Sequence, residues 1–293
     1  MYDVNMTNKW GQKAVVYQIY PQGCQDSNHD GIGDLHGIIK RLPYLQKLGV
    51  DVLWLNPIYD SPLKDNGYDI ADYEKILPTY GTMADFDELL AEIHNHGMKL
   101  LMDLVVNHTS DQHRWFQESK QSRDNQYADY YIWRDPVDGH EPNNWGAAFG
   151  GSAWTYVPER GQYYLHLFAP GQPDLNWENP AVRQSVWKIM RFWLDKGVDG
   201  FRMDVINLIS KPNGLPDAPE PANYAIVEPL VADGPKLNDY LHEMNEEVLS
   251  HYDVMTVGEM PSSKPEDAIA YTGLDSNELN MVFQFEHVQL SAN

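Results

Sequence analysis

The order of the apolar segments most limits what this chain of 293 residues can fold into. Short, almost wholly apolar runs alternate with longer stretches in which apolar residues recur at spacings of three and four. The short runs are typical of parallel strands covered on both faces, and the longer stretches are typical of amphipathic helices. We expect strands at residues 14–20, 52–57, 99–106, 200–205, 254–259 and 281–286. We expect helices at residues 35–49, 82–97, 180–197 and 236–250.

A strand followed by a helix, repeated along the chain, predicts a parallel α/β fold. Polar side chains at or near the ends of the expected strands favour a (β/α)8 barrel, since chemistry in that fold lies at the carboxyl ends of the strands. These side chains are Asp103, Asn107, Arg202, Asp204 and Glu259. A doubly wound sheet is the alternative, but no glycine-rich phosphate loop follows the first expected strand. Six expected strands would make the barrel incomplete, with about six βα units.

The alternation stops between residues 107 and 176. This segment is rich in Trp, Tyr, Gly, Asn and Pro, and it has no periodicity long enough to continue the pattern. A structureless loop of that length is uncommon in a compact domain. We therefore expect residues 107–176 to form a small irregular domain, domain B, inserted after the third strand and lying over the strand ends. Residues 1–106 and 177–293 would form the barrel.

Composition argues against several classes of partner. A formal charge of −22 and a pI near 4.7 argue against nucleic acid, whose binding requires clustered Lys and Arg. The single cysteine, Cys24, excludes an intrachain disulfide and is compatible with a reducing compartment. The sequence has neither a signal-peptide core nor a run of ~20 apolar residues that would span a membrane. We expect a cytoplasmic globular protein; its oligomeric state is not encoded in these patterns.

The loop after the first strand, DSNHDGIGD, carries oxygen atoms at regular spacing. They match positions 1, 3, 5, 7 and 9 of a calcium-binding loop, with Gly31 at the sharp turn. The ligands would be the side chains of Asp26, Asn28, Asp30 and Asp34 and the carbonyl of Ile32. Position 12 is Gly37 instead of a bidentate Glu, so the loop is not a complete EF-hand. An Asx-rich turn without a metal is the alternative, but the number of oxygens favours a structural Ca²⁺.

Two carboxylates, Asp204 and Glu259, end two successive strands. Glycoside hydrolysis needs such a pair, in which one carboxylate attacks the anomeric carbon and the other protonates the leaving oxygen. Arg202 shares a strand face with Asp204 and would keep it ionised, whereas the apolar neighbours of Glu259 would raise its pKa. Carboxylates at strand ends also bind Mg²⁺ in barrel lyases, and the residue types alone leave that alternative open.

Several short motifs along the chain form a set. DLVVNH at 103–108, GFRMDVIN at 200–207 and VGE at 257–259 resemble, in the same order, the first three conserved blocks of the α-amylase family of retaining glycosidases. QPDLNW at 172–177 resembles the additional block that marks the oligo-1,6-glucosidase branch, and DNGYDI at 65–70 agrees with it. The resemblance runs from about Trp10 to the last residue, and it implies a glycoside hydrolase acting on a small oligosaccharide.

The resemblance implies catalytic roles for residues of these blocks. Asp204 would be the nucleophile that forms a glycosyl-enzyme, Glu259 the general acid/base, and Arg202 the orienting cation. Val205 resembles the Val that follows the nucleophile in α-1,6-preferring enzymes, whereas Ala or Thr there goes with α-1,4 preference. The expected activity is therefore that of a retaining exo-α-glucosidase that hydrolyses α-1,6 bonds of short isomalto-oligosaccharides.

The resemblance also implies a pocket for the non-reducing glucose. Asp103 and His108 would contact this sugar, Asp65 would close the pocket, and Tyr68 would stack beneath the ring. Gln172, in the additional block, would complete the substrate-binding set. Alternative activities in the same family are trehalose-6-phosphate hydrolysis and α-1,4-glucosidase activity, and some family members are non-catalytic.

One departure from the family pattern lies near the C-terminus. The fourth block, with the third catalytic carboxylate, would follow the sixth strand, but the sequence reaches Asn293 first. The last two barrel strands and the C-terminal β domain of this branch are also absent from these 293 residues. Because the missing carboxylate acts where charge develops in the transition state, we expect little or no turnover from this chain by itself.

Overall fold

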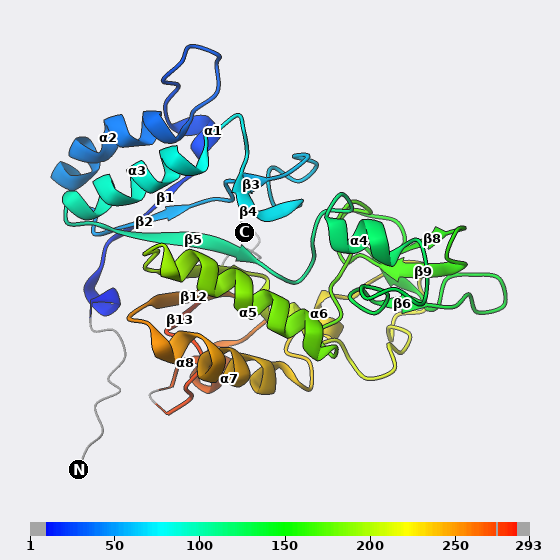
Figure 1. Cartoon of the computed structure of the whole chain (residues 1–293). Coiled ribbons are helices and arrows are strands. Elements are labelled where there is room, and N and C mark those ends of the chain that lie inside the picture. The colour runs from blue at the N-terminus through cyan, green and yellow to red at the C-terminus, as the bar shows by residue number, and fades with distance from the viewer. Residues whose placement is uncertain (1–9, 274, 286–293) are drawn as a thin grey trace, which may run out of the picture.

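A parallel sheet forms the centre of the computed structural model, which describes residues 10–273 and 275–285 (Figure 1). Within these residues the sheet has six strands in the order β1-β2-β5-β10-β12-β13, and every neighbouring pair is parallel. Its strands are β1 (Val16–Ile19), β2 (Val52–Leu55), β5 (Lys99–Val105), β10 (Gly200–Asp204), β12 (Met255–Glu259) and β13 (Met281–Phe283). All six expected strands are confirmed, and position 286 of the last prediction lies outside the described residues.

Four long helices flank the sheet, and all four were expected. They are α2 (Leu35–Leu48), α3 (Met83–Asn95), α5 (Pro180–Asp195) and α7 (Leu237–Glu247). Side-chain caps fix three of the helix starts, because Asp34, Thr82 and Asn179 accept hydrogen bonds from the first turns of α2, α3 and α5. Gly49 ends α2 with a left-handed φ of 88°, which glycine adopts without strain. Helix α8 (Pro265–Thr272) was not expected, since its apolar periodicity is weak.

Side chains alternate between the two faces of the sheet. One face packs against the helices and contributes residues such as Leu53, Met102 and Phe201 to the main core. The other face forms a smaller cluster that includes Leu101 and Val257 and lies on the inside of the curled sheet. This two-layer arrangement is that of an incomplete (β/α)8 barrel, as the sequence predicts.

The remaining short helical segments are η1 (Gly11–Lys13), α1 (Pro21–Cys24), η2 (Ile206–Leu208), α6 (Glu228–Val231) and η3 (Leu249–His251).

The segment expected to be irregular contains short regular elements beyond the end of β5 (Figure 1). These are α4 (Arg114–Ser119), β6 (Trp133–Arg134), β7 (Trp145–Gly146), β8 (Trp154–Val157) and β9 (Gln162–Leu165). Strands β6, β9 and β8 form an antiparallel sheet, while β7 pairs with β11 (Ala225–Ile226) from the segment that follows β10. A hairpin of β3 (Tyr59–Asp60) and β4 (Asp72–Ile76) follows β2. The division into a barrel and a domain B stays a prediction.

The helices of the described segments are too short or too polar to cross a bilayer.

Candidate active site

Arg202 joins three carboxylates at the carboxyl ends of three neighbouring strands. The register of β5 and β10 sets Arg202 beside Asp103, and its Nη1 donates to Asp103 Oδ1 at 2.8 Å and Asp204 Oδ1 at 2.6 Å. Its Nη2 lies 2.6 Å from Glu259 Oε2. The sequence predicted the pairing of Arg202 with Asp204, and the structure adds Asp103 and Glu259 to the same guanidinium. Strand alternation explains the arrangement, since the four side chains point into the barrel.

Burial raises the pKa of each carboxyl in this group. Loss of solvation and the nearby charge of Asp204 raise the pKa of Glu259 to about 7. Burial also raises the pKa of Asp204, with Arg202 opposing the rise, and it raises the pKa of Asp103 to about 6. Arg202 lowers the pKa of Asp204, whereas the charge of Asp204 raises the pKa of Glu259, and these directions favour an ionised Asp204 and a protonated Glu259.

Aromatic and amide side chains position Asp103. Trp54 Nε1 donates to Asp103 Oδ2 at 3.0 Å, and the Tyr68 hydroxyl lies 3.4 Å from the same oxygen. Asn56 Nδ2 donates to the Tyr68 hydroxyl at 2.7 Å, which fixes the position of the phenol ring. The guanidinium carbon of Arg202 lies 5.1 Å from the centre of the Trp54 ring, a cation–π contact. Sequence reasoning missed Trp54 and Asn56, although both belong to the run VLWLNP, in which Asn56 directly follows strand β2.

A second group of predicted residues gathers beside the first. Gln172 Nε2 donates to Asp65 Oδ2 at 2.8 Å and lies 3.2 Å from His108 Nε2. His108 Nε2 also lies 3.1 Å from the backbone carbonyl of Tyr68. Burial lowers the pKa of His108, so the imidazole is neutral at pH 7. Asp65 and Tyr68 share one loop, and the structure brings this loop together with His108 and Gln172, which are distant in the sequence.

A buried ion pair that the sequence did not reveal supports this second group. Lys211 Nζ lies 2.8 Å from Asp174 Oδ2 and donates to Asn107 Oδ1 at 2.8 Å. Asn107 Nδ2 in turn lies 3.2 Å from His108 Nδ1. A lone lysine in the loop after β10 has no periodic or motif signal, so only the tertiary structure identifies Lys211.

Comparison with known proteins identifies the family. The model of the alpha amylase catalytic domain matches residues 18–293. The chain belongs to the alpha-amylase family.

Several glycosidases are similar to this family member. An oligo-1,6-glucosidase of Bacillus cereus is 61% identical over 288 residues, which cover 98% of this chain and 52% of that protein. A trehalose-6-phosphate hydrolase of Bacillus subtilis is 55% identical over 282 residues, which cover 96% of this chain and 50% of that protein. The crystal structure of trehalose-6-phosphate hydrolase from Bacillus licheniformis has a TM-score of 0.92 at 54% identity, covering 96% of this chain and 50% of that one. The chain spans about half the length of the curated relatives it matches.

Val205 of this alpha-amylase family chain has an unusual backbone. Its φ of 35° and ψ of 42° lie in the left-handed region, which costs a β-branched residue on the order of 1–3 kcal/mol. The backbone N–H of Val205 donates to Glu259 Oε2 at 3.1 Å. Its side chain is buried in a cluster that also contains Trp145 and Leu208. The strained turn therefore ties the position after Asp204 directly to Glu259.

The interior of the curled sheet is hollow next to the carboxylates. A cavity of about 350 Å³ is lined by Arg202, Trp54 and Phe283, among other residues of the inner face. A larger hollow of about 390 Å³ lies at the amino end of β12, where Met255 and Glu278 line it, and it is remote from the carboxylates. The first cavity is the better candidate for a substrate pocket, because the charged cluster around Arg202 lies next to it.

The loop at residues 26–34 folds as a series of turns closed by its own oxygens. Asp26 Oδ2 accepts from the Gly31 N–H at 2.8 Å, and Asp30 Oδ1 accepts from the Ile32 N–H at 2.8 Å. The hydrogen bond from Gly31 is the main cause of a lowered pKa at Asp26, so this carboxylate is ionised at neutral pH. Gly31 takes a φ of 89°, as the sharp turn of a calcium-binding loop requires. The donor set is the hard-oxygen type that suits Ca²⁺.

Proposed function

We propose that this chain carries the nucleophile and the acid/base of a retaining exo-α-glucosidase that hydrolyses α-1,6 bonds of short isomalto-oligosaccharides. The observation that carries the proposal is the cluster in which Arg202 contacts Asp204 and Glu259 while the pKa of Glu259 is raised to about 7. A carboxylate pair with one proton on a defined member is what double displacement at an anomeric carbon requires.

The proposed reaction has two steps. An oxygen of Asp204 attacks the anomeric carbon as the glycosidic bond breaks, and Glu259 gives its proton to the leaving oxygen. The ionised Glu259 then takes a proton from a water molecule, which attacks the glycosyl-enzyme and releases glucose with retained configuration. Arg202 stays protonated throughout, since its carboxylate neighbours raise its pKa. It holds both carboxylates in place during the two steps.

The exo-acting mode is supported by the second group of residues. Asp65, Gln172 and His108 are joined by contacts of 2.8 and 3.2 Å and lie beside Tyr68 and the carboxylate cluster. We propose that their polar atoms bind the hydroxyls of a terminal glucose and that Tyr68 and Asp103 complete the pocket. A neutral sugar suits this acidic surface, because it carries no charge that the carboxylates would repel.

The preference for isomalto-oligosaccharides over trehalose 6-phosphate has an electrostatic basis. A phosphate needs an available cation, but the cations beside the pocket in the described part of the chain are already paired. Arg202 contacts three carboxylates, Lys211 lies 2.8 Å from Asp174, and Lys64 lies 2.8 Å from Asp111. We therefore favour the activity named for the oligo-1,6-glucosidase relatives.

The proposal is tested with the native gene product, purified as the cell makes it. Its kcat/KM is measured on isomaltose, maltose and trehalose 6-phosphate, and we expect isomaltose to have the highest value. A fluorinated glucosyl fluoride that slows release of the glycosyl-enzyme should label the peptide containing Asp204, as peptide mass spectrometry would show. A higher kcat/KM on maltose or trehalose 6-phosphate would refute the linkage, and labelling of another carboxylate would refute the mechanism.

The role of Val205 in linkage preference has a separate test. We expect Val205→Thr to shift the ratio of isomaltose to maltose hydrolysis toward maltose by about tenfold, an effect of about 1.4 kcal/mol. Val227→Thr is the matched control, because Val227 is buried in the same apolar cluster. An equal shift in both variants would show that Val205 acts only through packing.

We also propose that Asp26, Asn28, Asp30, Asp34 and the carbonyl of Ile32 bind a structural Ca²⁺. Ca²⁺ should then raise the melting temperature of chelator-treated protein in a concentration-dependent way, and Asp26→Asn should abolish the rise. Asp124→Asn, a change of the same kind at another exposed loop position, should leave the rise intact. A melting temperature that does not respond to Ca²⁺ would support the metal-free turn instead.

A further inference from the structure

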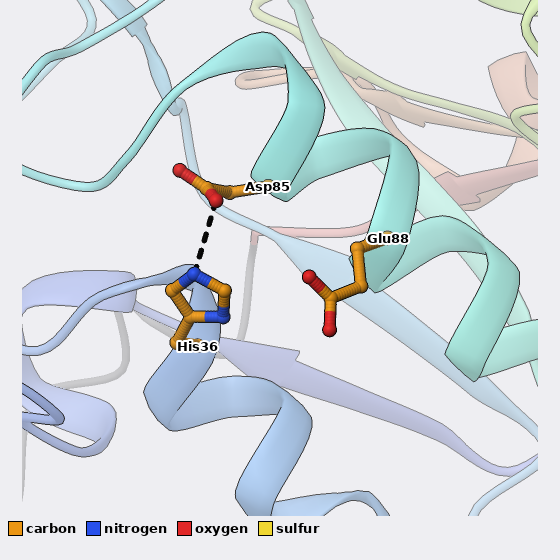
Figure 2. A group of neighbouring side chains, drawn as sticks. All are labelled: His36, Asp85 and Glu88. Atoms are coloured by element: carbon orange, nitrogen blue, oxygen red, sulfur yellow. Dashed lines mark ion pairs between the residues drawn. The ribbon is translucent and has the colours of Figure 1, made fainter.

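A histidine and two carboxylates meet on the outer surface, on helices α2 and α3, which flank the sheet side by side (Figure 1). His36 lies in the first turn of α2, whereas Asp85 and Glu88 lie three residues apart on one face of α3. A ring nitrogen of His36 and one oxygen of each carboxylate lie within 4.8 Å of one another (Figure 2). The shortest contact joins His36 Nε2 and Asp85 Oδ1 at 3.0 Å.

We propose that His36, Asp85 and Glu88 bind a Zn²⁺ ion that links α2 to α3. One imidazole and two carboxylates are zinc ligands, and three protein ligands leave the fourth tetrahedral position to water. The imidazole nitrogen selects against Ca²⁺ and Mg²⁺, which prefer oxygen ligands. Bonds of about 2.0–2.2 Å place tetrahedral ligand atoms roughly 3.4 Å apart. The His36–Asp85 contact is already that short, so only the exposed Glu88 side chain has to move inward.

The Asp85 carboxylate is held in position for this role. Its Oδ2 accepts hydrogen bonds from the N–H and hydroxyl of Thr82 at 2.7 and 2.8 Å, which leaves Oδ1 directed at His36. Gly81 leaves room for the carboxylate, because a Cβ there would lie 3.0 Å from Oδ2. Hydrogen-bonded carboxylates of this kind are typical of metal sites.

Glu88 distinguishes a metal site from a simple ion pair between His36 and Asp85. Within residues 10–273 and 275–285, no hydrogen bond or ion pair engages the Glu88 carboxylate, although it faces the His36 ring (Figure 2). Two carboxylates offer the charge that a divalent cation neutralises. An ion pair needs only His36 and Asp85 and does not involve Glu88.

A zinc ion at this position would stabilise the fold without taking part in the proposed reaction. It would join the first and second βα units through their helices, whereas the carboxylate cluster lies inside the sheet. Because the ion binds the folded protein, its stabilisation grows with the free zinc concentration. The effect is therefore measurable as a rise in melting temperature, independently of activity.

Zinc titration of the untagged native protein tests the proposal. The protein is treated with a chelator and dialysed into excess Ca²⁺, which occupies the proposed calcium loop, and ZnCl₂ is then added in a calorimeter. We expect one ion per chain, a rise in melting temperature with zinc, and no such response to MgCl₂. Co²⁺ bound in place of Zn²⁺ should give the visible absorption of a tetrahedral site.

Three variants locate the ion. We expect His36→Ala to weaken zinc binding at least about 100-fold, and Glu88→Gln by about tenfold or more. His242→Ala is the matched control, since His242 forms an exposed pair with Glu246 at 3.4 Å on α7 and should leave zinc affinity unchanged. Circular dichroism checks that each variant is folded. An affinity that His36→Ala and Glu88→Gln leave unchanged, or a melting temperature that zinc does not raise, would overturn the proposal.

Discussion

The two ends of strands β5 and β10 carry charged clusters built from similar residues but with opposite charge balance. At the amino end, Asp199 accepts hydrogen bonds from Lys99 Nζ at 2.7 Å and from the Leu100 N–H at 2.9 Å, and lies 2.8 Å from His94 Nε2. At the carboxyl end, the single guanidinium of Arg202 faces three carboxylates. The amino end has one acid with several donors, whereas the carboxyl end has a surplus of acid.

The difference in charge balance indicates that the amino end has a structural role and that the carboxyl end is suited to a reaction. A carboxylate that accepts from several donors ties the ends of two strands together. A buried surplus of carboxylates holds a proton at neutral pH, as the raised pKa of Glu259 shows, and this costs stability. Arg202 Nε is also buried without a hydrogen-bond partner among the described residues. The carboxyl end thus has the features of a reactive site, whereas the amino end has those of a structural contact that joins two strands.

The largest expected effect comes from Asp204→Asn. Removal of the proposed nucleophile should lower kcat/KM of the native gene product on isomaltose by about 10⁵-fold. Stability should stay equal or rise, because one of three buried carboxylates around Arg202 loses its charge. Activity assays and urea denaturation measure the two effects. A variant that keeps more than about one hundredth of the activity would contradict the contrast between the two ends.

Glu259→Gln should change how stability depends on pH. The pKa of Glu259 rises from 4.5 to about 7 on folding, so the folded protein binds the proton more tightly. The resulting stabilisation is fully present below pH 4.5 and is lost as the pH rises through 7. At pH 8 the variant should be more stable than the wild type by about 3 kcal/mol, and the difference should vanish near pH 4.

Urea denaturation at both pH values measures this difference, and activity gives a second readout. Because Glu259 donates a proton in the first step of the proposed reaction, wild-type activity should fall above about pH 7. A stability difference between wild type and Glu259→Gln that does not vary with pH would contradict the assignment of the proton to Glu259.

Asp199→Asn should have a smaller effect, and it should lower stability while leaving activity nearly unchanged. This change removes the negative charge and one of the two acceptor oxygens at the amino end, and it should lower the free energy of unfolding by about 1–3 kcal/mol. The activity of the folded enzyme should stay within about twofold, since Asp199 lies at the other end of the barrel from Glu259. Urea denaturation and kcat measure both effects. Lost activity with unchanged stability would show that the amino end is not merely structural.

The smallest effect should come from His94→Ala. The His94 side chain is 40% exposed, so solvent weakens its interaction with Asp199. We expect a loss of less than about 1 kcal/mol in the free energy of unfolding, measured in urea beside Asp199→Asn. A loss as large as that of Asp199→Asn would show that His94 is the main partner of Asp199.

The four long helices and the strands of the parallel sheet were predictable from the sequence, whereas the two-residue strands were not. Helices such as α5 and strands such as β5 span enough residues for their apolar period to be read along the chain. Strands β6 and β7 have two residues each, so they show no period, and their pairing depends on distant partners. For the same reason, the sequence did not reveal that β11 would pair with β7.

The sequence by itself determined which strand ends carry charge and which residues match the alpha-amylase blocks. Alternation along a strand is local, so Arg202 and Asp204 had to share a face. Only the tertiary structure decided that Arg202 reaches Asp103 and Glu259, because these contacts depend on the register of neighbouring strands. The same holds for Lys211 beside Asp174, and for His36 beside Asp85, which meet only when α2 packs against α3. Charge balance within a cluster is a property of side chains distant in sequence, and folding alone brings them together.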